Sequence, residues 1–193
     1  MLDEKFSLTL SDSEMKSFKT KHGFAEENIL LIMGGGDGIP HGELILQNLL
    51  QQKIDFEIVF VCGKNKKLYN FAVEVKEKGN YDNLKVYGYV DFVYELLSVS
   101  DLVITKCGAS TFMEILLMKK VPLVNSYIWE QEKGNVDFLV KNKLGIYEKR
   151  IPKLTEIAKE LFADRNKLNE YKKNIEDYNF ENGTAKAAEF ILK

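Results

Sequence analysis

The sequence predicts an α/β fold in which helices cover both faces of a doubly wound, mainly parallel sheet of six strands. Short runs such as residues 28–33 and 56–62 are apolar at all but one position each, rather than alternating, which is typical of strands buried on both faces. Longer helical patterns separate these runs, and this alternation favours parallel strands with right-handed connections. Ligands of such sheets bind beyond the carboxyl ends of the strands, so we expect a site in the loops that follow them.

The elements can be assigned in chain order from their apolar patterns. Strands are expected at residues 28–33, 56–62, 84–87, 102–104 and 121–125, with a weaker sixth strand at 145–148. Helices are expected after the loop at 34–40 to about residue 52, after 63–65 to about 78, after 88–91 to near 99, from near 110, from near 131, and through the C-terminal segment. Residues 1–27 are polar with scattered apolar positions. We interpret them as a lead-in or interdomain linker that packs on the sheet edge, and residues 28–193 as the domain.

Composition narrows the classes of function. The chain of 193 residues fits one domain, and its net charge of -2 gives no electrostatic case for a nucleic-acid partner. No stretch has the roughly 18 apolar residues of a membrane-spanning helix, and the first residues lack a signal-peptide layout. Cys62 and Cys107 end apolar runs without metal-ligand spacing. We therefore expect two buried, reduced thiols and a cytoplasmic compartment.

The segment from Thr105 to Glu114 carries the strongest functional signal. It reads Thr-Lys-Cys-Gly-Ala-Ser-Thr-Phe-Met-Glu and joins a strand to a helix. Small residues at such a turn expose backbone N–H groups at the positive end of the helix, where a phosphate binds well. Glu114 lies one turn into the helix, placed to accept hydrogen bonds from the two hydroxyls of a ribose. The pattern therefore indicates a nucleotide site.

Two common nucleotide-binding motifs are excluded. The glycine cluster at residues 34–38 would need a further glycine at Ile39 or His41 to match G-x-G-x-x-G, and no carboxylate ends the second strand. Gly63 and Lys64 are not preceded by the first glycine of a P-loop, since Ile58 occupies that position. Neither an NAD domain nor a P-loop NTPase is expected.

An ordered set of five segments resembles the C-terminal half of GT-B glycosyltransferases. The segments are Gly-Gly-Gly at 34–36, Cys-Gly-Lys-Asn at 62–65, Gly-Tyr-Val at 88–90, Thr-Lys-x-Gly at 105–108 and Gln-Glu-Lys-x-Asn at 131–135. The likeness runs from about residue 28 to the end. It is most similar to the branch with the muramyl-pathway N-acetylglucosaminyltransferase, monogalactosyldiacylglycerol synthase and processive diacylglycerol glucosyltransferase (glycosyltransferase family 28). The resemblance implies a Rossmann-like half of a GT-B fold.

The resemblance also implies a site for a UDP-sugar donor. The uracil would lie near Tyr89 and Val90, the glycine-rich loops would cradle the diphosphate, and Glu114 would bind the ribose. Gln131 and Glu132 would contact sugar hydroxyls, and Asn135 completes that motif. The expected donor-binding residues are Gly35, Gly36, Gly63, Tyr89, Val90, Lys106, Gly108, Ala109, Ser110, Thr111, Glu114, Gln131, Glu132 and Asn135.

No metal or other cofactor is expected, since the chain has no Asp-x-Asp. Helix-start N–H groups, with Lys106 nearby, would stabilise the charge that UDP gains as the glycosidic bond breaks. Two departures from the family pattern bear on the donor sugar. Cys107 stands where proline, serine or alanine is frequent, and Trp129-Glu130 replaces a frequent Pro-Gly. For Trp129, packing is favoured over stacking on a sugar.

The family's N-terminal domain, which supplies the acceptor site and the catalytic base, has no counterpart in this chain. His22 lies in the lead-in and His41 in the first loop, and neither matches a family position, so the catalytic residue is unknown. We expect the donor half of an inverting hexosyltransferase that acts on a membrane lipid such as diacylglycerol, peripheral on the cytoplasmic face. The acceptor domain would lie in cis, with this chain a fragment, or on a partner subunit.

Two other functions stay open at this point. One is a UDP-sugar 2-epimerase-like domain, which shares the GT-B architecture, and the other is a non-enzymatic nucleotide-binding module. In the family the last helix often crosses onto the other domain, which predicts exposed apolar surface near the C-terminus of this chain. Alone, the chain is expected to bind donor but to transfer sugar poorly, because closure over both substrates builds the site.

Overall fold

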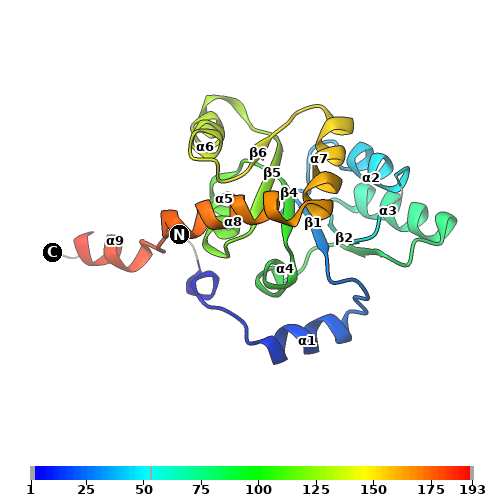
Figure 1. Cartoon of the computed structure of the whole chain (residues 1–193), viewed down its shortest axis with the longest axis horizontal. Helices are drawn as coiled ribbons and strands as arrows, with labels where there is room; N and C mark the ends of the chain where they lie inside the picture. The colour runs from blue at the N-terminus through cyan, green and yellow to red at the C-terminus, as the bar shows by residue number, and fades with distance from the viewer. Residues whose placement is uncertain (1–2, 53, 192–193) are drawn as a thin grey trace.

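The computed structural model describes residues 3–52 and 54–191 and confirms the predicted fold (Figure 1). Its six strands are all parallel, in the order β3-β2-β1-β4-β5-β6. The strands are β1 (Ile29–Met33), β2 (Glu57–Val61), β3 (Leu84–Tyr87), β4 (Leu102–Lys106), β5 (Val121–Ser126) and β6 (Ile146–Tyr147). The chain runs outward from β1 to β3 and then returns to place β4 beside β1. The loops after β1 and β4 diverge at this switch point, which creates a crevice at the carboxyl edge of the sheet.

Helices follow each of the first five strands, as predicted. They are α2 (Gly42–Leu50), α3 (Lys66–Gly79), α4 (Val93–Val99), α5 (Ala109–Leu117) and α6 (Trp129–Lys141). After β6 come α7 (Ile151–Ala163), α8 (Arg165–Tyr178) and α9 (Thr184–Ile191). Helix α6 begins two residues earlier than expected, so Gln131 lies within its first turn rather than at its first residue.

The core lies on both faces of the sheet, because alternate residues of each strand point to opposite sides. In β1, Leu30 and Ile32 pack in one cluster with side chains of α2 and α7, whereas Leu31 and Met33 pack in a second cluster with α4. These four side chains are at most 4% exposed. Burying one such aliphatic side chain contributes roughly 1.5–3 kcal/mol, so the paired layers hold the strands that carry the loops.

Residues before β1 form helical structure that the sequence analysis did not assign. A 3₁₀ helix, η1 (Glu4–Ser7), precedes α1 (Asp12–Lys21). Ser11 caps α1 by accepting a hydrogen bond from the Glu14 amide, and the Glu14 carboxylate accepts one from the Ser11 amide. Phe6 is buried, with its ring edge-on to Tyr94 of α4. The segment covers α4 on one face of the sheet (Figure 1). It also reaches the edge strand β3, where His22 Nδ1 lies 2.9 Å from the Tyr87 hydroxyl.

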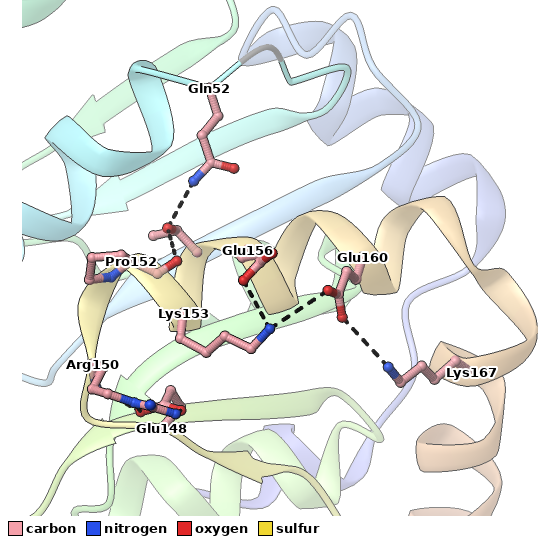
Figure 2. Close-up of polar contacts among 9 residues, drawn as sticks. Gln52, Glu148, Arg150, Pro152, Lys153, Glu156, Glu160 and Lys167 are labelled. Carbon is pink, nitrogen blue, oxygen red and sulfur yellow. Dashed lines mark hydrogen bonds and ion pairs between the residues drawn. The ribbon is translucent and has the colours of Figure 1, made fainter.

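Helix α7 packs on the opposite face and joins the end of α2 through a side-chain contact. The Gln52 amide donates to the Thr155 hydroxyl at 2.9 Å, and Figure 2 shows this link beside a chain of surface ion pairs along α7. In that chain the Lys153 ammonium lies 2.9 Å from Glu156 and 3.9 Å from Glu160. Exposed pairs of this kind contribute at most about 1 kcal/mol, so apolar burial holds α7 in place.

Helix α9 extends away from the sheet and ends in exposed apolar side chains (Figure 1). Phe190 and Ile191 are 82% and 80% exposed, as expected for a last helix that packs on something outside this domain. In the described part of the chain, no helix is both long and apolar enough to cross a bilayer.

Candidate functional site

The loops after β1 and β2 touch through their backbones at the carboxyl edge of the sheet. Gly63 has a left-handed φ of +59°, and a Cβ on it would lie 2.4 Å from the Gly36 carbonyl oxygen. The Lys64 amide donates to the same oxygen at 2.7 Å. Only glycine fits at position 63, because a side chain would be strained by the backbone conformation and would also collide with main chain.

A pocket of about 880 Å³ lies between the loop after β1 and the starts of two helices, α2 and α5. Neither helix start has a side-chain cap. The first intrahelical bonds are donated by the Ile45 and Phe112 amides. Of the N–H groups before them, that of Gly42 donates to the Ile39 carbonyl at 3.2 Å, and the others have no partner among the described residues. Two uncapped helix starts in one pocket make it a favourable place for an anion. We call it the larger pocket.

A second pocket of about 370 Å³ adjoins the first and contains Glu114. Gly35, Gly36 and Thr111 line both pockets, so the two form one cleft. Gly35 has a φ of +85°, and a Cβ on it would lie 3.9 Å from the Thr111 hydroxyl. Tyr89 is 68% exposed at the wall of this smaller pocket. The loops after β1, β3 and β4 therefore converge on one site.

The carboxylate of Glu114 is partly desolvated and unpaired. Burial raises the pKa of this carboxyl group above its ordinary value, Lys5 opposes the shift, and Asp3 adds to it. Within residues 3–52 and 54–191, no hydrogen bond or ion pair reaches the Glu114 carboxylate. Such a group can accept hydrogen bonds from hydroxyls of a ligand at little cost.

Each oxygen of the Glu132 carboxylate, in the larger pocket, has one polar partner. Its Oε1 lies 3.1 Å from the Lys106 ammonium, and its Oε2 accepts a hydrogen bond of 2.6 Å from the Ile128 amide. These bonds connect the end of β4 to the first turn of α6. The pair fixes the loop after β5 against the loop after β4.

Two asparagines hold the loops of the cleft from behind. The Asn125 amide donates to the Pro40 carbonyl at 2.9 Å, and the Asn135 amide donates to the Cys107 carbonyl at 3.2 Å. The pairing of β4 with β5 shifts register at Lys106, a bulge of the kind that re-aims side chains beside sites. Cys107 is buried, as predicted, and burial raises the pKa of its thiol to about 12.

Of the residues expected to bind donor, all but Gln131 and Asn135 line one of the two pockets. Those in the larger pocket are Gly35, Gly36, Lys106, Gly108, Ala109, Ser110, Thr111 and Glu132. Those in the smaller pocket are Gly35, Gly36, Gly63, Tyr89, Val90, Thr111 and Glu114. Gln131 is exposed on α6 and lines neither pocket. The packing expected for Trp129 is wrong, since its side chain is 83% exposed and its φ is +49°.

The structure adds cleft residues that the sequence analysis missed. Lys5 and Phe6 of η1 line the smaller pocket, although nothing in the sequence pattern connects them to a loop about 30 residues later. His41, which starts α2 in a left-handed conformation, lines the larger pocket. Asn125, which supports the cleft from behind, is a buried amide at the end of a strand. A polar residue in such an apolar run could have indicated a structural hydrogen bond there.

Residues 29–189 match the glycosyltransferase family 28 C-terminal domain. The chain is 34% identical over 174 residues to a processive diacylglycerol beta-glucosyltransferase of Bacillus subtilis, which covers 86% of this chain and 44% of that protein. It is 32% identical over 143 residues to a probable chloroplastic monogalactosyldiacylglycerol synthase of Nicotiana tabacum, covering 70% of this chain and 26% of that protein. The chain thus spans less than half the length of these relatives.

Solved structures share the fold at lower sequence identity. HepE of Anabaena, in complex with UDP and glucose, superimposes with a TM-score of 0.70 at 14% identity, over 92% of this chain and 50% of HepE. MurG of Acinetobacter baumannii superimposes with a TM-score of 0.69 at 18% identity, over 87% of this chain and 50% of MurG. With the family match over most of its length, the chain belongs to the glycosyltransferase family 28 C-terminal domain family.

Proposed function

We propose that the cleft binds a UDP-sugar. The observation that carries this proposal is the junction of the two pockets at Gly35, Gly36 and Thr111. It places two uncapped helix starts next to a partly desolvated carboxylate that has no hydrogen-bond or ion-pair partner among the described residues. A nucleoside diphosphate needs these two features side by side: N–H groups for the phosphates and an acceptor for the ribose hydroxyls.

In the proposed complex each pocket takes one part of the donor. The uridine enters the smaller pocket, where Tyr89 and Val90 form the wall and Glu114 accepts hydrogen bonds from the ribose. The diphosphate lies between the starts of α2 and α5. The sugar then extends past Ile128 and Glu132, which line the larger pocket.

The reaction that follows from such a complex is hexosyl transfer with UDP as the leaving group. The uncapped start of α5 and the Lys106 ammonium would stabilise the negative charge on UDP more strongly as the bond breaks, without a metal ion. The diacylglycerol glucosyltransferase of Bacillus subtilis supports a membrane lipid such as diacylglycerol as the acceptor. A lipid acceptor would place the enzyme at a membrane surface, and we propose peripheral attachment at the cytoplasmic face. The acceptor site and base would come from a second domain or a partner subunit.

Calorimetric titration tests the binding proposal directly. UDP should bind the chain with a Kd between about 1 μM and 1 mM. ADP should bind more weakly, because its purine base is larger than the uracil that we place in the smaller pocket. Addition of EDTA should leave UDP binding unchanged. Undetectable UDP binding would argue strongly against a donor site. UDP binding that never leads to transfer, even with an acceptor domain supplied, would favour a non-enzymatic module.

A further inference from the structure

An ion pair lies inside the larger pocket, against the residue that precedes α5. Side chains of its two members, Lys106 and Glu132, are 23% and 14% exposed. A Cβ on Gly108 would lie 3.0 Å from the Lys106 ammonium and 3.5 Å from Glu132 Oε1. Both charges therefore lie where the diphosphate of the proposed donor would bind.

The Glu132 carboxylate is the anion that pairs with Lys106 inside the larger pocket. It neutralises Lys106, the cation nearest the start of α5 among the residues that line the larger pocket. An incoming diphosphate bears more negative charge than one carboxylate and also gains the free N–H groups of the helix start, so it competes for the same ammonium. The hydrogen bond that the Ile128 amide donates to Glu132 Oε2 keeps Glu132 in place when Lys106 turns to the diphosphate.

We propose that Glu132 is a specificity-determining residue that holds Lys106 before the donor binds, yields it to the diphosphate, and then accepts a hydroxyl of the donor sugar with the oxygen set free. This inference rests on the proposed function and adds an order to it: Glu132 Oε1 is released to the sugar when a diphosphate has taken Lys106. Without a diphosphate, a sugar hydroxyl must share Glu132 Oε1 with the Lys106 ammonium, which weakens that hydrogen bond. The exchange thus selects a sugar that is attached to a diphosphate.

The substitution Glu132→Gln tests the exchange, because its amide oxygen can still accept from the Ile128 amide while its charge is lost. UDP should bind this variant about 3- to 10-fold more tightly than wild type, since no carboxylate competes for Lys106. The affinity for UDP-glucose and UDP-galactose should rise less than the affinity for UDP. The Kd of UDP, divided by the Kd of whichever of the two UDP-sugars binds more tightly, should therefore fall by about 3-fold or more. Uridine should bind wild type and variant equally.

Glu130→Gln is the matched control, because it makes the same charge change on the same helix turn. Glu130 is exposed and lies 3.9 Å from Lys133, outside both pockets. This control should change every Kd by less than about 2-fold. Thermal unfolding of both variants checks that the domain stays folded.

The outcomes separate the exchange from simpler roles. Equal tightening of UDP and UDP-sugar by Glu132→Gln would mean fixed repulsion and would overturn the exchange. Weakening of both ligands would mean that Glu132 only supports the loop, which also overturns it. If wild type and all variants fail to bind UDP, the proposed function itself is wrong and the exchange falls with it.

Discussion

The two pockets of the cleft each contain a glutamate near the start of a helix, yet the two carboxylates are in opposite states. Glu114 has no partner in the described part of the chain and is partly desolvated, whereas both oxygens of Glu132 are bonded. The difference comes from neighbours on other strands: Lys106 faces Glu132, and glycine loops face Glu114. Position on a helix therefore does not say whether an acidic residue is free to bind a ligand.

Gly36 lines both pockets and is held by the loop after β2, so Gly63→Ala should have the most severe effect on the junction of the pockets. A methyl group there would meet the Gly36 carbonyl at 2.4 Å in a left-handed backbone. We expect a loss of about 2–4 kcal/mol in the free energy of unfolding, measured by urea denaturation. Gly36→Ala is the control and should cost less than about 1 kcal/mol, because its Cβ would meet nothing within 4 Å. Equal losses would contradict this account.

Substitutions of the two carboxylates should change the affinity for UDP in opposite directions, and Glu114→Ala tests the first of them. Removing the ribose acceptor should weaken UDP by about 10- to 100-fold, whereas Glu132→Gln should tighten it. Titration calorimetry with UDP and uridine measures the effect, and both ligands should weaken together since both contain the ribose. Glu130→Ala, an exposed acid on α6, serves as the control. A change below about 3-fold in Glu114→Ala would remove Glu114 from the site.

The substitution Lys120→Met tests whether a charged side chain that is desolvated, but lies far from the cleft, affects UDP binding. Lys120 lies at the opposite edge of the sheet, where it donates to the Ser98 carbonyl at 2.8 Å, and burial lowers its pKa to about 8. Because the folded chain binds this proton less tightly than the unfolded chain, its stability falls as the pH drops from about 10.5 through 8.

The Lys120→Met variant should therefore be about 1–3 kcal/mol more stable at pH 7, with the gain shrinking toward pH 10. UDP affinity should not change. Urea denaturation at both pH values and one titration at pH 7 give the answer. A change in UDP affinity would mean that buried charge far from the cleft contributes to binding after all.

The smallest expected effect is a change in the free energy of unfolding caused by Glu114→Gln. The raised pKa of Glu114 means that the folded chain holds this proton more tightly than the unfolded chain. Between the ordinary value of 4.5 and the raised value, stability therefore falls as pH rises. The variant should be more stable than wild type at pH 7, and the difference should shrink when urea denaturation is repeated at pH 4. A difference independent of pH would argue against a desolvated carboxylate.

The sheet and its loops were predictable because local patterns determine them. Apolar runs gave the strands, and small residues after the runs gave the turns that meet at the switch point. Helix α1 was also readable, since Ser11 and Glu14 form a capping box signal, but it was not assigned. The pairing of Lys106 with Glu132 joins residues 26 apart, and the burial of Phe6 depends on α4. Such contacts depend on tertiary packing, which no local pattern contains.

The supports behind the cleft act on main-chain atoms. Lys64 and Asn125 bond to the carbonyls of Gly36 and Pro40, and Asn135 bonds to the carbonyl of Cys107. Carbonyl oxygens are the same whatever side chain the supported residue carries. A different side chain at position 107 would therefore leave the hydrogen bond from Asn135 in place. Supports of this kind tolerate a change of side chain at the residues whose carbonyl groups they hold.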